Sequence, residues 1–176
     1  MRIEEKSSTY TCIRFSRQDR ILTATLSRPQ AMNAVNAALH EELSRLFHDL
    51  ADDEASDVLV LTGEGRAFCA GGDLVWLQEA IDDPDVFLRM GAEARRILFG
   101  QLELEKPLIC RLNGAATGLG ASLALACDMT IAASHAVIGD PHVSVGLVAG
   151  VQFVRSFLTN LIVPPILLQH FRNPNG

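Results

Sequence analysis

Two glycine-containing loops of this sequence could present backbone N–H groups to a ligand. In the first, Gly71 and Gly72 stand immediately before Asp73, which is placed to cap a helix that starts at Leu74. The second, residues 113–120, has the sequence NGAATGLG and leads into another short helix. Because glycine has no Cβ, a polar ligand atom can approach the main-chain amides of such loops closely.

Each loop is predicted to follow a buried strand. The apolar run VLVL at 58–61 is typical of a strand that is covered on both faces, and Gly63 then turns the chain. The segment PLICRL at 107–112 predicts a second strand. Two strands of one parallel sheet, each ending in a loop at a helix N-terminus, can direct two amides at one point. That arrangement is the geometry of an oxyanion hole.

Four motifs give the sequence a family resemblance. They are SRPQAMNA at 27–34, AFCAGGDL at 67–74, NGAATGLGASLALACD at 113–128 and GDPHVSVGLVAG at 139–150. In this order they resemble the enoyl-CoA hydratase/isomerase, or crotonase, family over about residues 12–150. The resemblance implies an α/β fold of the ClpP/crotonase type, which is a spiral of repeated β-β-α units.

The resemblance also implies a chemistry. Enzymes of this family bind an acyl-CoA thioester and stabilise the enolate oxyanion that forms at its carbonyl with two backbone N–H groups. The matching donors in this sequence are Gly72 and Leu119. Leucine replaces the commoner glycine at the second position, which keeps the amide donor but narrows the space above it.

The acid and base groups depart from the hydratase pattern. A hydratase of this family uses two glutamates to activate water and move protons, and the matching positions here are Ser122 and His142. Neither residue is a carboxylate, so a two-glutamate hydration mechanism is not expected. His142 could transfer protons because imidazole titrates near neutrality, and Asp140 is the nearest carboxylate. The alternatives are an exposed loop histidine and a turn residue before Pro141.

The resemblance places coenzyme A along two segments, as part of the substrate and not as a tightly bound cofactor. The implied contact residues are Arg28, Gln30, Ala31, Met32, Ala67, Phe68, Ala70, Asp73 and Leu74. Arg28 and Arg66 could pair with the phosphates of coenzyme A. The alternative for both arginines is a solvated position on the surface.

The remaining elements are predicted from local patterns. β-Favouring residues at 12–17 and 20–26 indicate a hairpin. Asn36 is placed to cap a helix to about residue 50, in which His40 and His48 are assigned no role. The side chains expected to face outward from this helix are Glu41, Glu42, Arg45 and Asp49.

A longer helix is predicted to follow Asp85 and to end near Glu103. The residues expected on its buried face are Phe87, Met90, Ala94, Ile97 and Leu98. Further strands are predicted at 128–133 and 136–138.

The composition is that of a folded domain. The 176 residues are 48% hydrophobic and 20% charged, which is sufficient for a core. A net charge of −6 with only two lysines argues against nucleic acid or an anionic membrane surface as the main partner.

The four cysteines form no C-x-x-C pair, and no histidine has metal-ligand spacing, so we expect buried, reduced thiols and no metal site. The N-terminus lacks the apolar region of a signal peptide, which favours a cytoplasmic location.

The C-terminal segment, residues 151–176, matches no motif of the family. We therefore predict a crotonase-like core domain at 1–150, and a truncated or frame-shifted tail in which the family's C-terminal helices are missing or altered. With those helices present, the family would form a homotrimer or hexamer. Two hypotheses of function follow. The two loops favour an acyl-CoA-processing enzyme, whereas the missing glutamates favour a catalytically silent member that keeps at most CoA-ester binding.

Overall fold

The larger sheet has five strands in the order β1-β2-β3-β5-β7. The computed structural model describes residues 2–139, and the strands of this sheet are β1 (Ile13–Gln18), β2 (Ile21–Leu26), β3 (Val58–Gly63), β5 (Leu108–Leu112) and β7 (Met129–Ala132). The first two strands pair antiparallel, as the hairpin prediction requires, and every other neighbouring pair is parallel. In the parallel register, Leu61 of β3 lies opposite Cys110 of β5.

A second, smaller sheet contains the segments that the sequence assigned to loops. Its three parallel strands are β4 (Ala67–Cys69), β6 (Ala115–Thr117) and β8 (Ile138–Gly139). The prediction that each loop directly follows the strands at 58–61 and 107–112 is therefore wrong, although the two loops do end parallel strands of one sheet. They follow β4 and β6, which come after β3 and β5 along the chain, and this repetition is the β-β-α unit that the family resemblance implies.

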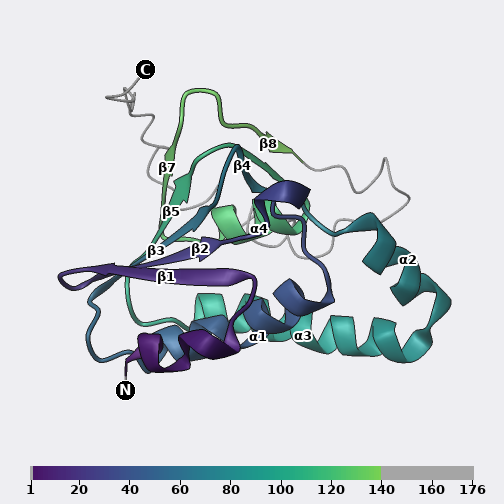
Figure 1. Ribbon diagram of the computed structural model, residues 1–176, viewed down its shortest axis with the longest axis horizontal. Coiled ribbons are helices and arrows are strands. Elements are labelled where there is room, and N and C mark those ends of the chain that lie inside the picture. Colours follow the sequence, from purple (N-terminus) through teal and green to yellow (C-terminus); the bar gives the residue numbers. More distant parts are fainter. Residues whose placement is uncertain (1, 140–176) are drawn as a thin grey trace.

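The α-helices in the described residues are α1 (Ala37–Ala51), α2 (Leu74–Asp82), α3 (Pro84–Leu102) and α4 (Leu119–Leu125), and short 3-10 helices occupy Ile3–Thr9 and Pro29–Ala31. Two of the α-helices, α1 and α2, begin where the predicted capping residues Asn36 and Asp73 place them, whereas α3 begins at Pro84, before Asp85, and α4 has no side-chain cap. The Asn36 side chain accepts a hydrogen bond from Leu39 N (3.0 Å), and the Asp73 side chain accepts one from Val75 N (3.2 Å). Figure 1 shows α1 and α3 below the sheet, with α2 and the start of α3 extending away from it.

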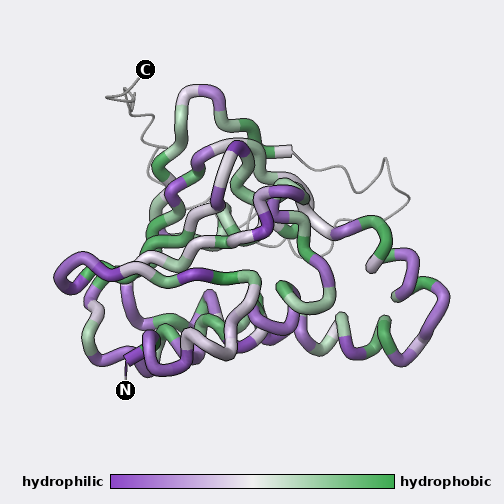
Figure 2. The backbone as a smooth tube through the Cα atoms, viewed as in Figure 1, coloured by the Kyte–Doolittle hydropathy of each residue, from purple (hydrophilic) through white to green (hydrophobic). Residues whose placement is uncertain are grey.

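The core lies between the larger sheet and α1. Its fully buried side chains include Leu22, Leu43, Phe47, Leu59 and Leu61. In Figure 2 the central strands are largely hydrophobic, and the outer turns are hydrophilic. All four cysteines are buried and free, which confirms the prediction of buried thiols. Between residues 2 and 139, no helix has the length and apolar character needed to cross a bilayer.

The outward face predicted for α1 is wrong at Glu42. Its side chain is buried, and its carboxylate accepts hydrogen bonds from Thr11 N (2.6 Å) and Cys12 N (3.0 Å). These two backbone N–H groups lie before β1, where they need acceptors that the sheet does not supply. Asp49 also contacts the N-terminal segment, since its carboxylate accepts a hydrogen bond from the Tyr10 hydroxyl (2.7 Å). Both carboxylates therefore tie the N-terminal segment to α1.

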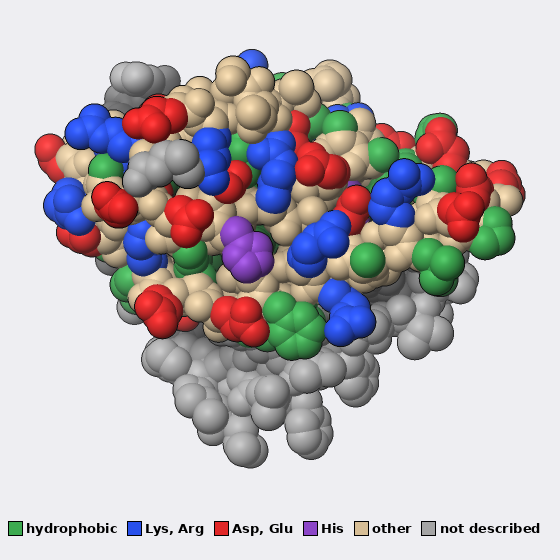
Figure 3. Space-filling view, turned by 90° about the horizontal axis from the view of Figure 1, so that it is seen from below, with side chains coloured by type: hydrophobic (Ala, Val, Ile, Leu, Met, Phe, Trp, Pro, Cys, Tyr) green, Lys and Arg blue, Asp and Glu red, His purple; other side chains and the backbone are tan. Residues whose placement is uncertain are grey.

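The buried face predicted for α3 is correct only in part. Ile97 is buried, and Met90, Ala94 and Leu98 are partly buried. Phe87, however, is 57% exposed, because the first turns of α3 extend beyond the sheet together with α2. Figure 3, which views the molecule from the side of α1 and α3, shows acidic and basic side chains interspersed on this face.

Candidate active site

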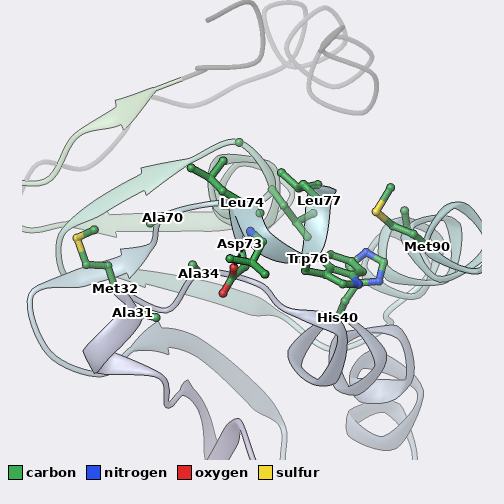
Figure 4. A pocket seen from close by; sticks show the side chains of 16 residues that line it. Ala31, Met32, Ala34, His40, Ala70, Asp73, Leu74, Trp76, Leu77 and Met90 are labelled. Carbon is green, nitrogen blue, oxygen red and sulfur yellow. Dashed lines mark hydrogen bonds between the residues drawn. The ribbon is translucent and has the colours of Figure 1, made fainter. Parts of the chain in front are cut away.

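A cavity of about 580 Å³ lies where the two glycine-containing loops meet. Its walls come from the segment before α1, from the first loop and α2, from the start of α4, and from α1 and α3. The lining residues are Ala31, Met32, Ala34, His40, Ala70, Gly71, Gly72, Asp73, Leu74, Val75, Trp76, Leu77, Met90, Ala94, Gly118 and Leu119. Figure 4 shows Met32 and Ala31 at one end of this cavity and Met90 at the other.

The two loops are in direct contact at Gly71. Its φ of +86° is a conformation that favours glycine, and a Cβ at this position would lie 2.9 Å from the Thr117 carbonyl oxygen. The Thr117 hydroxyl donates a hydrogen bond to the Ala70 carbonyl oxygen (2.7 Å). This contact brings the residues that follow, Gly72 and Leu119, to the same cavity.

The backbone around Gly72 fixes the direction of its N–H group. Val35 pairs with Gly72 in a parallel bridge, in which Val35 N donates to Gly71 O (2.7 Å) and Asp73 N donates to Val35 O (2.9 Å). In such a bridge the central residue directs its own N–H away from the partner segment. Within residues 2–139 the structure shows no acceptor for the Gly72 N–H, which leaves it available to a ligand in the cavity.

Leu119 is the first residue of α4. The first four N–H groups of a helix have no partner within that helix, and the structure shows none for Leu119 N–H among the residues it describes. Gly118, immediately before it, has φ +52°. Both predicted donors therefore follow a glycine with a positive φ.

Of the residues implied as acid or base, only Ser122 lies in the described part of the structure. The Ser122 hydroxyl lies 3.3 Å from the Gly118 carbonyl oxygen of its own helix, to which it donates a hydrogen bond. Ser122 is not among the residues that line the cavity. Asp140 and His142 lie outside residues 2–139, as does the predicted tail at 151–176.

The structure brings only some of the implied coenzyme A contacts to the cavity. Those that line it are Ala31, Met32, Ala70, Asp73 and Leu74. Ala67 and Phe68 are instead buried in β4, away from the lining, and Gln30 is exposed outside it. The aspartate has a structural partner, because its carboxylate lies 3.4 Å from the Arg28 guanidinium.

The two arginines proposed as phosphate partners differ in their surroundings. Arg28 has a side chain that is only 16% exposed, and besides its ion pair with Asp73 it donates a hydrogen bond to the Ala34 carbonyl oxygen. It therefore ties the segment before α1 to the first loop. Arg66 is exposed, in the turn between β3 and β4.

One pair of titratable residues at the cavity was assigned no role from the sequence. His40 is 2% exposed, and its Nδ1 lies 2.7 Å from a carboxylate oxygen of Glu93, which is 7% exposed. The imidazole ring also packs on Trp76, with ring centroids 4.8 Å apart. Burial lowers the pKa of His40 by more than the neighbouring Glu93 raises it. The apolar spacing of His40 with Leu43 and Phe47, at i, i+3 and i+7, could have indicated its burial.

Cys69 is a poor candidate for a nucleophile. Burial raises the pKa of its thiol to about 11, so that the thiol stays protonated near neutral pH. No group of three or more histidine, cysteine, aspartate or glutamate side chains within residues 2–139 is placed to hold a metal ion.

Comparison with known proteins identifies a matching family and several relatives. A family model described as enoyl-CoA hydratase/isomerase matches residues 16–164. The chain is 39% identical over 136 residues to 2,3-dehydroadipyl-CoA hydratase of Escherichia coli, a match that covers 77% of this chain and 51% of that protein. It is 34% identical over 143 residues to crotonyl-CoA hydratase of Syntrophomonas wolfei, covering 80% of this chain and 54% of the relative.

Solved structures give the same result. An enoyl-CoA hydratase/isomerase from Mycobacterium paratuberculosis is 40% identical and superposes with a TM-score of 0.77, over 79% of this chain and 56% of the other. The chain thus spans about half the length of the curated relatives and solved structures that it matches. The match to the family model, the sequence identities and the shared spiral fold together show that the chain belongs to the enoyl-CoA hydratase/isomerase family.

Proposed function

We propose that this protein processes acyl-CoA thioesters and stabilises a thioester enolate with the backbone N–H groups of Gly72 and Leu119. The observation that carries this proposal is the matched geometry of the two donors. Each directly follows a glycine with positive φ, each lines the same cavity, and neither has an acceptor within residues 2–139.

The proposed chemistry follows from the charge that develops on the thioester oxygen. When a proton leaves the carbon next to the thioester carbonyl, negative charge moves to the carbonyl oxygen. Two fixed N–H donors stabilise this charge without having to reorganise during the reaction. Removing one such donor typically costs about 3 kcal/mol of transition-state stabilisation.

His142 is proposed to transfer the proton, with Asp140 as the neighbouring carboxylate. The support is chemical, since imidazole is the side chain whose ordinary pKa suits proton transfer near neutral pH. Ser122 is not proposed as a base, because its hydroxyl donates a hydrogen bond within α4. A two-glutamate hydration mechanism is therefore not proposed for this chain.

Coenzyme A is proposed to bind as part of the substrate, at the end of the cavity formed by Ala31 and Met32. Ala70, Asp73 and Leu74 continue this wall toward Gly72. The thioester would then lie between the two N–H donors, and the acyl chain would extend toward Trp76. No tightly bound cofactor and no metal ion takes part in this proposal.

The sharpest test removes one donor without disturbing the fold. Leu119→Pro eliminates the N–H at the first position of α4, where proline is well tolerated and where the described structure loses no hydrogen bond. Leu119→Ala is the matched control, because it trims the side chain and keeps the N–H. We expect the proline variant to lower kcat/KM for an enoyl-CoA by about 10² to 10³ relative to the alanine variant. Equal activities of the two variants would contradict the proposed oxyanion hole.

A catalytically silent member of the family is the second candidate. It is favoured by the residue types at 122 and 142, serine and histidine, where a hydratase of the family has glutamates. Calorimetric titration with crotonyl-CoA, alongside an absorbance assay of the conjugated thioester, separates the two candidates. Turnover supports the enzyme, whereas binding without turnover supports the silent member.

A homotrimer or hexamer where the family's C-terminal helices are present, and a place in the cytoplasm, are also proposed. Exposed apolar side chains on α2 and α3 support self-association, among them Leu74, Val75, Ile81, Phe87 and Leu88. Light scattering on the purified chain would test whether this apolar surface drives self-association, and a monomer at micromolar concentration would contradict that role.

A further inference from the structure

His40 places a polar group in an otherwise apolar part of the cavity. Its ring contacts Trp76, and Met90 and Ala94 complete the wall around it. Figure 4 shows His40 beside Trp76, toward the Met90 end of the cavity and away from Ala31 and Met32. A buried polar side chain in such surroundings is costly unless it has a hydrogen-bond partner.

Glu93 satisfies only one of the two ring nitrogens. A carboxylate oxygen accepts hydrogen bonds, so the 2.7 Å contact assigns the donated proton to His40 Nδ1. The other nitrogen, Nε2, is then a hydrogen-bond acceptor in the neutral ring. No residue between 2 and 139 donates a hydrogen bond to it. The buried Glu93 thus fixes the ring so that an acceptor remains unused at a cavity wall.

We propose that His40 is a specificity-determining residue that accepts a hydrogen bond from a hydroxyl group near the distal end of the acyl chain. This inference rests on the proposed binding of acyl-CoA thioesters. It deepens that proposal by assigning the substrate class, which is a hydroxylated acyl-CoA and not a purely aliphatic one.

The position of His40 along the cavity supports a contact with the distal part of the acyl group. Coenzyme A is proposed at the Ala31 and Met32 end, and the thioester at Gly72 and Leu119. The remaining cavity, next to Trp76 and Met90, is the part left for the end of the acyl chain.

The electrostatics of the pair favour a hydroxyl over a carboxylate on the substrate. Because burial lowers the pKa of His40, the ring is neutral near pH 7 and offers an acceptor, not a positive charge. A substrate carboxylate would also meet the negative charge of Glu93 on the other side of the same ring. A hydroxyl donates one hydrogen bond and adds no charge.

The test compares matched thioesters on the purified chain. Dissociation constants are measured by calorimetry for hexanoyl-CoA and 6-hydroxyhexanoyl-CoA, and for shorter and longer pairs of the same design. We expect the hydroxylated member of at least one pair to bind about tenfold more tightly, which is the effect of one added hydrogen bond to an acceptor on a residue that lines the cavity. Equal or weaker binding of the hydroxylated member in every pair would overturn the inference.

Variants then test whether the preference for the hydroxylated thioester comes from His40 and Glu93. The double variant His40→Leu with Glu93→Leu avoids leaving a buried carboxylate unpaired. It should abolish the preference for hydroxylated thioesters, while thioesters without the hydroxyl group still bind. His48→Leu is the control, because His48 is exposed on the same helix, outside the cavity. A preference that persists in the double variant would overturn the assignment. If wild-type protein binds no thioester at all, the proposed function itself fails, which is a different outcome.

Discussion

The α-carbon of Gly71 lies against the carbonyl of Thr117, so that a Cβ on Gly71 would come within 2.9 Å of that oxygen. This contact joins the loop after β4 to the end of β6. The two predicted N–H donors come shortly after it in the sequence, Gly72 after Gly71 and Leu119 after Thr117. The spacing of the two donors therefore depends on the absence of one side chain.

Replacing this glycine should damage both stability and function. In Gly71→Ala, the φ of +86° is unfavourable for alanine and the new Cβ meets backbone, which cannot move aside as a flexible side chain can. We expect a loss of about 1–3 kcal/mol in the free energy of unfolding, and a fall in kcat/KM that exceeds what partial unfolding explains. Urea titration and enzyme assay on the same samples measure the two effects.

Gly91 provides the matched control for this substitution. It lies within α3, where a Cβ would meet nothing within 4 Å and where φ is not positive. Gly91→Ala should raise the free energy of unfolding by about 0.5–1 kcal/mol, because alanine favours the helix. If both substitutions had the same effect on stability, the contact at Thr117 would not matter.

A second prediction concerns the buried carboxylate of α1. Glu42 accepts hydrogen bonds from Thr11 N, Cys12 N and the Thr11 hydroxyl (2.8 Å). Glu42→Ala would leave two backbone N–H groups without acceptors, at about 1–3 kcal/mol for each buried group. Glu41→Ala removes a neighbouring but exposed carboxylate and should change stability by no more than about 0.5 kcal/mol. Similar unfolding midpoints for the two variants would show that the Glu42 contacts carry little stability.

The elements that were predicted correctly are those specified by nearby residues. The apolar run of β3, the Asn36 cap of α1 and the Asp73 cap of α2 all depend on residues within one turn or one strand. Such local signals are present in the sequence whatever the rest of the chain does. For the same reason the two donor loops could be found from glycine positions alone.

The elements that were missed depend on partners far along the chain. β4 and β6 have only three residues each, with the sequences AFC and AAT, and show no alternation of apolar and polar side chains. They become strands only because they pair with each other. Likewise His40 and Glu93 stand 53 positions apart on separate helices, and each has the residue type of an exposed helix position. Only the packing of α1 on α3 makes them a buried pair.

The last prediction concerns acid unfolding and the carboxylate of Asp53. Burial acts to raise its pKa, but the neighbouring Ser56 hydroxyl and the hydrogen bonds that the carboxylate accepts from Ile3 N (3.0 Å) and from Arg17 (2.9 Å) outweigh burial and lower it. A carboxyl whose pKa is lower in the folded state contributes stability that is fully present above its unfolded pKa of about 3.9. That contribution is lost as the pH falls through the folded pKa. The free energy of unfolding should therefore decrease steeply below about pH 4.

Asp53→Asn isolates this contribution. The asparagine keeps a hydrogen-bond acceptor of similar shape but cannot ionise, so the ion pair with Arg17 is lost. We expect the variant to be less stable by about 2 kcal/mol at pH 7, and we expect this difference to shrink as the pH falls below about 4 and through the lowered folded pKa of the wild-type carboxyl. Urea unfolding across this pH range measures both quantities. A constant difference between wild type and variant at every pH would mean that the loss comes from packing at residue 53 and not from its charge, because packing does not titrate.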